Sequence, residues 1–229
     1  MINNLYDSVL DIIGPEMIGP SSSHTAGAVR IGLACRSILN SPLKNVKIEL
    51  YNSFAETGFG HGTEKAILAG LLGLSKSDER IKYSDKIMKK KRIKYTIKRI
   101  LTPNNYKPNT AIIKMKSNKL TVEVVAVSIG GGLILIEQID GFEVNITAEN
   151  ETLIITHKDK LGILAKILNI LATEKMNIVS INSVRHNKLE DIKTIITFDN
   201  FIEEKIREKI MKLDDIIRVR IIHKIKEIW

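Results

Sequence analysis

The side chains best suited to chemistry gather in one short stretch near the start of the chain. Ser21–Ser23 are followed directly by His24 and Thr25, and the apolar spacing beyond them predicts a helix that ends at about Leu39. A helix N-terminus presents unpaired N–H groups and a positive dipole end, which suit a carboxylate or phosphate. One hydroxyl would be enough to cap the helix. The additional serines therefore indicate a binding role for this loop.

His24 is the candidate general base of that loop. The environment of a histidine can place its pKa near neutrality, where the side chain accepts and releases protons efficiently. The alternative interpretation is a histidine that lies on the surface or caps the helix.

Two further loops are rich in glycine. Gly58–Thr63, which includes His61, leads into a helix predicted from Glu64 to about Leu72, and Gly130–Gly132 follows a predicted strand. Glycine lets the backbone approach a ligand or adopt positive φ, but a tight turn at the first loop is equally expected and a β-bulge is favoured at the second. Neither loop has the glycine spacing or basic residue of a nucleotide site. No trustworthy Ser-His-Asp spacing and no metal-ligand cluster is visible.

The chain has one cysteine, Cys35, which excludes an internal disulfide. It also excludes a thiolate metal site or an iron–sulfur cluster built by this chain alone, because such sites use three or four cysteines. Cys35 lies inside a predicted helix and is expected to be a small core residue.

The net charge of +9 is concentrated in one window. Between Arg80 and Lys107 eleven Lys and Arg residues face one acid, Asp85, so this window carries +10 and the rest of the chain −1. A solvated helix end and strand face is the favoured explanation. Nucleic-acid binding is the alternative, but aromatic residues that could stack on bases make up only 5% of the chain.

The composition predicts a folded, soluble protein. Of the 229 residues 44% are hydrophobic and 27% are charged, which is close to the globular average. No apolar run approaches the roughly 20 residues of a membrane span. The first residues show no secretory signal. We therefore expect a cytoplasmic protein with no membrane partner.

The elements that position these loops form two groups, and the first is a mixture of helices and strands. It is predicted to hold a helix at Leu5–Ile13, a strand at Val46–Leu50, a basic helix from about Ser77, strands near 93–99, 110–116 and 120–128, and a hairpin turning at Asp140–Gly141.

From residue 149 the pattern becomes a compact alternation. Strands are predicted at Thr152–Thr156, Asn177–Arg185, Lys193–Phe198 and Ile216–Ile222, and helices at Leu161–Thr173 and around Ile202, Ile206 and Ile210. This β-α-β-β-α-β order is the ferredoxin-like arrangement. The predicted fold class is therefore α+β, with one domain at 1–148 and a ferredoxin-like domain at 149–229.

The string Asp11–Gly27 resembles the beta chain of iron–sulfur-dependent bacterial L-serine dehydratases. The resemblance continues through Ser53–Thr57, Gly60–Thr63, Pro108–Thr110 and Ser128–Gly132, and so covers essentially the whole chain. The second half is similar to an ACT domain, a regulatory module that commonly binds amino acids between paired copies. Its first loop, Asp159–Gly162, matches the usual ACT loop.

The resemblance implies the deamination of L-serine to pyruvate and ammonia, a lyase reaction of serine metabolism that feeds gluconeogenesis. It also implies a 4Fe-4S cluster held by cysteines of a separate alpha chain, so that the two chains form a heterodimer. A Lewis acid on the leaving oxygen would assist the elimination. The lone Cys35 agrees with a cluster held elsewhere.

The resemblance also implies roles for individual residues. His24 would be the base. The substrate carboxylate would be held by Ser21, Ser22, Ser23, Thr25 and Gly27, and the same pocket would be bordered by His61, Gly62, Thr63, Gly130 and Gly131. In the ACT domain an amino acid, expected to be serine, would bind between two copies at Asp159, Gly162 and Asn177. The alternative is a ligand-free ACT pair that serves only for self-association.

Two positions depart from the family pattern. Glu64 stands where relatives often have Asp, and Lys107 stands where many have His before Pro-Asn-Thr. The first change keeps the charge, whereas the second puts any role for side chain 107 in doubt. The other function class that fits the sequence is a free-standing amino-acid sensor whose ACT domain regulates another protein.

Overall fold

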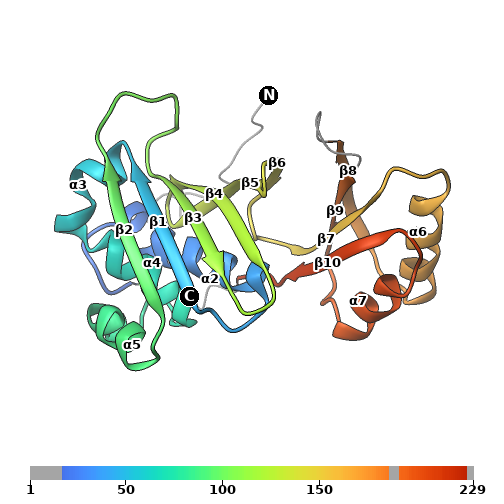
Figure 1. The fold of residues 1–229 in the computed structure, drawn as a ribbon, viewed down its shortest axis with the longest axis horizontal. Helices are drawn as coiled ribbons and strands as arrows, with labels where there is room; N and C mark the ends of the chain where they lie inside the picture. Colours follow the sequence, from blue (N-terminus) through green and yellow to red (C-terminus); the bar gives the residue numbers. More distant parts are fainter. Residues whose placement is uncertain (1–16, 186–190, 226–229) are drawn as a thin grey trace. The chain divides into compact units, whose positions relative to one another are not determined.

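The computed structural model describes residues 17–185 and 191–225 (Figure 1). The helix predicted at Leu5–Ile13 lies outside the described residues. The chain splits into two compact units. Of the described residues, the N-terminal unit comprises those up to Ile139 together with Asn145–Thr147, and the C-terminal unit comprises Asp140–Val144 together with those from Ala148 onward. The mixture of helices and sheets confirms the predicted α+β class.

A six-stranded sheet has the order β2-β1-β3-β4-β5-β6. Its first five strands in chain order belong to the N-terminal unit, and β6 begins in the segment Asp140–Val144 of the C-terminal unit and ends in Asn145–Thr147 of the N-terminal unit. β1 pairs in parallel with β2 and antiparallel with β3, and the β3–β4 and β4–β5 pairs are antiparallel. The strands are β1 (Asn45–Tyr51), β2 (Lys94–Ile100), β3 (Thr110–Lys116), β4 (Thr121–Gly130), β5 (Leu133–Ile139) and β6 (Phe142–Ile146). The strands predicted in this half are confirmed, as is the hairpin at Asp140–Gly141, where both residues have positive φ.

Helices cover one face of this sheet (Figure 1). α2 packs against β4 and β5, and α4 packs against α2. The helices are η1 (Ser22–Gly27), α2 (Ala28–Leu39), α3 (Ser53–His61), α4 (Thr63–Leu72), η2 (Glu79–Tyr83) and α5 (Ser84–Lys90). Cys35 is fully buried in α2, as predicted.

The crossing of α2 and α4 depends on two glycines. A Cβ atom on Gly70 would lie 2.0 Å from the carbonyl oxygen of Val29, and one on Gly32 would lie 2.4 Å from that of Ile67. Backbone therefore meets backbone at this point. Any side chain here would push the two helices apart.

The prediction of loops at Ser21–Thr25 and Gly58–Thr63 is wrong for most of these residues, which are helical. Ser22–Gly27 form a π-helix that continues into α2, and Ser53–His61 form α3 with Gly58 inside it. Glycine and serine have weak helix propensity, but the burial of Phe54, Ala55 and Gly58 in α3 overrides it. The chain breaks only at Gly62, whose φ of 70° separates α3 from α4.

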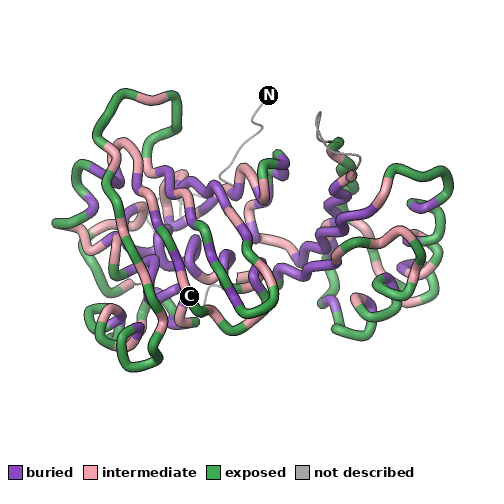
Figure 2. Tube along the Cα trace, in the orientation of Figure 1, coloured by how far each residue is buried: buried purple, intermediate pink, exposed green. Residues whose placement is uncertain are grey.

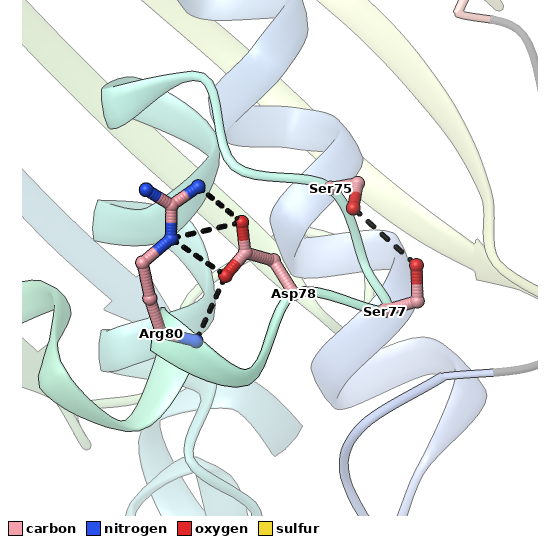
Figure 3. Close-up of polar contacts among 4 residues, drawn as sticks. All are labelled: Ser75, Ser77, Asp78 and Arg80. Carbon is pink, nitrogen blue, oxygen red and sulfur yellow. Dashed lines mark hydrogen bonds and ion pairs between the residues drawn. The ribbon is translucent and has the colours of Figure 1, made fainter.

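The basic helix predicted from about Ser77 is present as η2 followed by α5, and Asp78 caps its start. The carboxylate of Asp78 accepts hydrogen bonds from the backbone N–H of Arg80 at 2.8 Å and from its guanidinium at 2.6 Å, and the Ser75 and Ser77 hydroxyls lie 3.4 Å apart (Figure 3). The guanidinium holds the pKa of Asp78 below its usual range. The lysines of the edge strand β2 are exposed, in agreement with a solvated strand face (Figure 2).

The C-terminal unit has a four-stranded antiparallel sheet in the order β10-β7-β9-β8, with two helices over one face. Its elements are β7 (Glu151–Lys158), α6 (Ile163–Thr173), β8 (Ile178–Arg185), β9 (Asp191–Phe198), α7 (Glu204–Met211) and β10 (Ile216–Ile222). This is the predicted ferredoxin-like order. Its core includes Leu153, Ile167, Ile196, Ile206 and Ile221.

Within the described residues, no helix has the length and apolar character needed to cross a membrane.

Candidate active site

The π-helix η1 holds His24 inside the N-terminal unit. Ser21 caps it in an extended conformation, and its hydroxyl accepts a hydrogen bond from the backbone N–H of His24 at 3.2 Å. The histidine is only 8% exposed. The alternative interpretation of a surface histidine is therefore wrong.

Hydroxyl groups surround both ring nitrogens of His24. Nδ1 lies 3.2 Å from the hydroxyl of Ser23 and 3.4 Å from that of Ser21. Nε2 lies 2.9 Å from Thr57 Oγ1 and 3.2 Å from Ser53 Oγ. Ser53 and Thr57 are four residues apart on α3, so their side chains share one helix face.

The contacts on Nε2 identify the basic nitrogen. Thr57 donates its hydroxyl hydrogen to the carbonyl oxygen of Ser53 at 2.9 Å, which leaves its lone pairs facing Nε2. The same carbonyl lies 3.4 Å from Nε2 and can only accept. The proton of neutral His24 therefore belongs on Nε2. The lone pair on Nδ1 faces the hydroxyls of Ser21 and Ser23.

Burial lowers the pKa of His24 below its usual value of 6.5. The carbonyl of Ser53 opposes this shift, whereas the nearby His61, with ring centroids 4.8 Å apart, adds to it. The ring also meets the edge of Phe54 at 5.3 Å. His24 is therefore neutral at pH 7, which is the form that a base requires.

The second predicted motif meets the first. Thr25 donates its hydroxyl to the carbonyl oxygen of His61 at 3.2 Å, and His61 Nδ1 lies 3.0 Å from the carbonyl of Thr57. Gly62 makes the turn that follows, and Thr63 is fully buried directly after it. Residues 61–63 thus lie beside η1.

The glycine turn after β4 is connected to the same helix. A Cβ atom on Gly27 would lie 2.1 Å from Ser128 Oγ, so η1 and β4 are in close contact. Arg30 on α2 donates to the carbonyl of Gly132 at 3.2 Å. The pairing of β4 with β5 shifts register between Ser128 and Gly130, which agrees with the favoured β-bulge.

Three polar atoms in these motifs are buried without a hydrogen-bond partner in the part of the chain that the structure describes. They are Thr63 Oγ1, Ser128 Oγ and Asn109 Oδ1. An unpaired buried polar atom costs about 1–3 kcal/mol. Asn109 also donates through its amide nitrogen to the carbonyl of Ser128 at 3.4 Å.

Four residues of the site received no role from the sequence. Ser53 and Thr57 contact His24, Ser128 lies against Gly27, and Asn109 donates to the carbonyl of Ser128. Ser53, Thr57, Asn109 and Ser128 all lie in the motifs that carry the family resemblance. Only for Ser53 and Thr57 does the sequence hint at a shared role, because residues four positions apart lie on the same face of a helix. That segment was not predicted as a helix.

Lys107 forms an exposed ion pair. Its Nζ lies 2.6 Å from Glu137 Oε1, and its side chain is 55% exposed. The side chain that departs from the family pattern is thus engaged with β5.

The described residues do not fit an iron–sulfur cluster. No group of three or more His, Cys, Asp or Glu side chains in residues 17–185 and 191–225 could hold a metal ion. Cys35 is fully buried, and desolvation raises the pKa of its thiol, which disfavours the thiolate that binds metal.

The predicted effector residues of the C-terminal unit are all exposed. Asp159 pairs with Arg185, Gly162 has a φ of 79° with open space around its Cα, and Asn177 donates to Asp199 at 3.1 Å. Among the described residues, no hydrogen bond or ion pair joins Asn177 to the other two.

Comparison with known proteins identifies both halves. The family described as serine dehydratase beta chain matches residues 8–139, and the ACT domain family matches residues 152–215. The chain is 40% identical to the probable L-serine dehydratase beta chain of Bacillus subtilis, over 93% of this chain and 97% of that protein. It is 33% identical to the L-serine dehydratase beta chain of Peptoniphilus asaccharolyticus, over 90% and 94%. It also shares 49% identity over 61 residues, 24% of this chain and 13% of the relative, with an L-serine dehydratase of Streptomyces coelicolor.

Proposed function

The chain belongs to the serine dehydratase beta-chain family and carries an ACT domain, and we propose that it is the beta subunit of an enzyme that deaminates L-serine to pyruvate and ammonia. The observation that carries this proposal is the enclosed, neutral His24 with hydroxyls on both ring nitrogens. We assign residues 1–148 to the catalytic-subunit domain and 149–229 to the ACT domain.

In this proposal His24 removes the α-proton of serine. The lone pair of Nδ1 takes the proton, the released electron pair forms the Cα–Cβ double bond, and hydroxide leaves Cβ with the electrons of the C–O bond. The resulting aminoacrylate tautomerises to an imine, which water hydrolyses to pyruvate and ammonia. The hydroxyl of Thr57 accepts the Nε2 hydrogen and so holds the ring in the tautomer that leaves Nδ1 basic.

The substrate carboxylate would be held by the hydroxyls and backbone of η1. We assign this role to Ser21, Ser22, Ser23, Thr25 and Gly27, with His61, Gly62, Thr63, Gly130 and Gly131 bordering the site. The unpaired oxygens of Asn109, Ser128 and Thr63 supply further polar groups that a zwitterionic amino acid would satisfy. Fixed donors of this kind favour a single substrate orientation.

The 4Fe-4S cluster is assigned to a separate alpha chain, because the described residues of this chain do not fit it. The short match to the Streptomyces coelicolor L-serine dehydratase supports a divided enzyme, since most of that protein lies outside the matched part. The complete enzyme would thus be a heterodimer, or a multiple of one, in the cytoplasm. No nucleic-acid partner is proposed.

The ACT domain is proposed to regulate this activity. An amino acid, with serine as the first candidate, would bind between two ACT copies at Asp159, Gly162 and Asn177, and the pairing would also give self-association. The exposure of all three residues supports a site that a second copy completes.

Co-expression tests the division of labour. The chain and an alpha chain with clustered cysteines are produced together and separately without oxygen, and pyruvate formed from L-serine is measured. We expect activity and cluster absorbance only in the complex, and a colourless product when this chain alone is treated with iron and sulfide. Turnover of serine by the purified chain alone would overturn the proposal.

A further inference from the structure

The sheet of the C-terminal unit carries a cluster of cations on the face that points away from its helices. Leu153 and Ile155 of β7 point into the helix-covered core, so Thr156 points to the opposite face because side chains alternate along a strand. Thr156 is paired with Arg218 on β10 and with Lys193 on β9.

Arg220 joins this cluster from the next row. It is paired with Ile154, which lies on the same face as Thr156. Lys193, Arg218 and Arg220 therefore project from one side of the sheet. Lys193 is 3% exposed and Arg220 is 4% exposed, which is unusual for side chains that carry a full charge.

These two cations are covered by a short segment of the same unit, Asp140–Val144. The Nζ of Lys193 lies 3.6 Å from the ring centroid of Phe142, and Arg220 Nη2 lies 3.3 Å from Asp140 Oδ2. Arg220 Nε is buried without a hydrogen-bond partner in the described part of the chain. One carboxylate thus contacts a guanidinium that still has an unused donor.

Among the described residues, few carboxylates lie near Lys193, Arg218 and Arg220 to balance their positive charge. Asp140 contacts Arg220 and acts on Lys193, whereas Asp191, which also acts on Lys193, is engaged with Lys158 at 2.7 Å. Desolvation, helped by the charges of Arg220 and Arg218, lowers the pKa of Lys193 to about 8, and Asp140 and Asp191 only partly oppose the shift. Burying cations without matching anions is costly, so an added anion would be favourable here.

We propose that this face binds a small oxyanion, a carboxylate or phosphate group, between Lys193 and Arg220. The guanidinium offers planar donors that suit two oxygens, and the ammonium offers a point charge. The two strands that carry them are separated by β7, and the two residues are offset by two positions along it, so their backbones lie roughly 12 Å apart, which two long side chains can close around one anion. The site is separate from His24 and from the Asp159–Gly162 loop.

Thermal unfolding and calorimetry of the full chain test this site with two probes. Potassium phosphate and sodium malonate distinguish a phosphate from a carboxylate preference, and potassium chloride at the same ionic strength controls for screening. We expect saturable stabilisation by one or both probes. Lys193→Met should weaken binding at least tenfold, and Lys193→Arg should retain it. The control Lys212→Met alters an exposed lysine at the end of α7 and should leave binding unchanged.

Asp140→Asn separates anion binding from a purely structural role. If Lys193 and Arg220 only hold the segment Asp140–Val144 in place, removing the Asp140 carboxylate leaves the response to either probe unchanged. If they form an anion site, it removes a competing negative charge and should tighten binding severalfold. The proposal is overturned if neither probe acts beyond chloride, if Lys193→Met binds as well as the unaltered chain, or if Asp140→Asn fails to tighten binding.

Discussion

The two proposed functional sites differ in how much of the environment the chain itself provides. His24 is enclosed by η1 and α3, and its two ring nitrogens face hydroxyl groups. The effector loop at Asp159 and Gly162 is exposed, and Gly162 faces open space. A side chain that must transfer a proton needs a fixed tautomer and position before substrate arrives. A regulatory site can instead be completed by a second copy, so that binding and assembly are linked.

The largest expected effect is on turnover. His24→Ala in the complex with the alpha chain should lower kcat by a factor on the order of 100 or more, in the range for a removed acid or base. Cluster absorbance should not change. His223→Ala alters a histidine of the C-terminal unit that contacts Glu151 and should keep nearly full activity. A His24 variant with normal kcat would transfer the role of base to His61 or to the partner.

The next largest expected effect is on stability, at the glycine contact where α4 crosses α2. Gly70→Ala places a methyl group against the backbone of Val29, and we expect the free energy of unfolding to fall by about 1–3 kcal/mol. Gly60→Ala is the matched control, because nothing lies within 4 Å of the added Cβ in α3. It should be neutral or stabilising by up to about 1 kcal/mol. Equal losses in urea unfolding would show that the helix crossing is not what limits stability.

Thr57→Val tests whether the enclosed environment sets the state of His24. Removing the hydroxyl that accepts from Nε2 should lower kcat about tenfold and further lower the pKa of His24, because the lost bond favours the charged ring more than the neutral ring. Since the neutral ring is the base, activity rises with pH through this pKa and is complete above it. The acid limb of the pH profile should therefore move to lower pH. Thr57→Ser keeps the hydroxyl, and a shift in that variant as large as in Thr57→Val would argue against this role.

The ease of predicting the two units from sequence follows from the same difference. The ACT elements are held by local apolar periodicity, so residues such as Ile206 and Ile210 reveal their helix directly. In the N-terminal unit the sequence reveals the motifs but not their conformation. Ser53–His61 forms a helix because one of its faces is buried, not because its residues have high helix propensity. The contact of Gly27 with Ser128, about 100 residues later in the chain, leaves no trace in local sequence. The Nε2 partners of His24, Ser53 and Thr57, are also long-range contacts, whereas its Nδ1 partners are its sequence neighbours Ser21 and Ser23.

The smallest expected effect is the binding of serine to the ACT domain, and it depends on pairing. Calorimetry of the full chain with L-serine and a panel of other amino acids should give heat with serine, and the heat should decrease when the chain is diluted until copies separate. Gly162→Val should abolish it, because a β-branched residue is strained at a φ of 79° and would fill the open space where the ligand backbone approaches.

Asn177→Ala is a second test of the same site, for the case that Gly162→Val fails to fold. It should weaken serine binding without affecting the fold. Asn169→Ala, an exposed change on α6 outside the loop, is the control, and Lys193→Met should leave serine binding intact because it alters a different face. Silence across the whole panel would leave the ACT domain with an assembly role only. Heat that persists in Gly162→Val would instead show that serine binds elsewhere. The exposure of this loop, in contrast to the enclosure of His24, would then have a cause other than ligand binding.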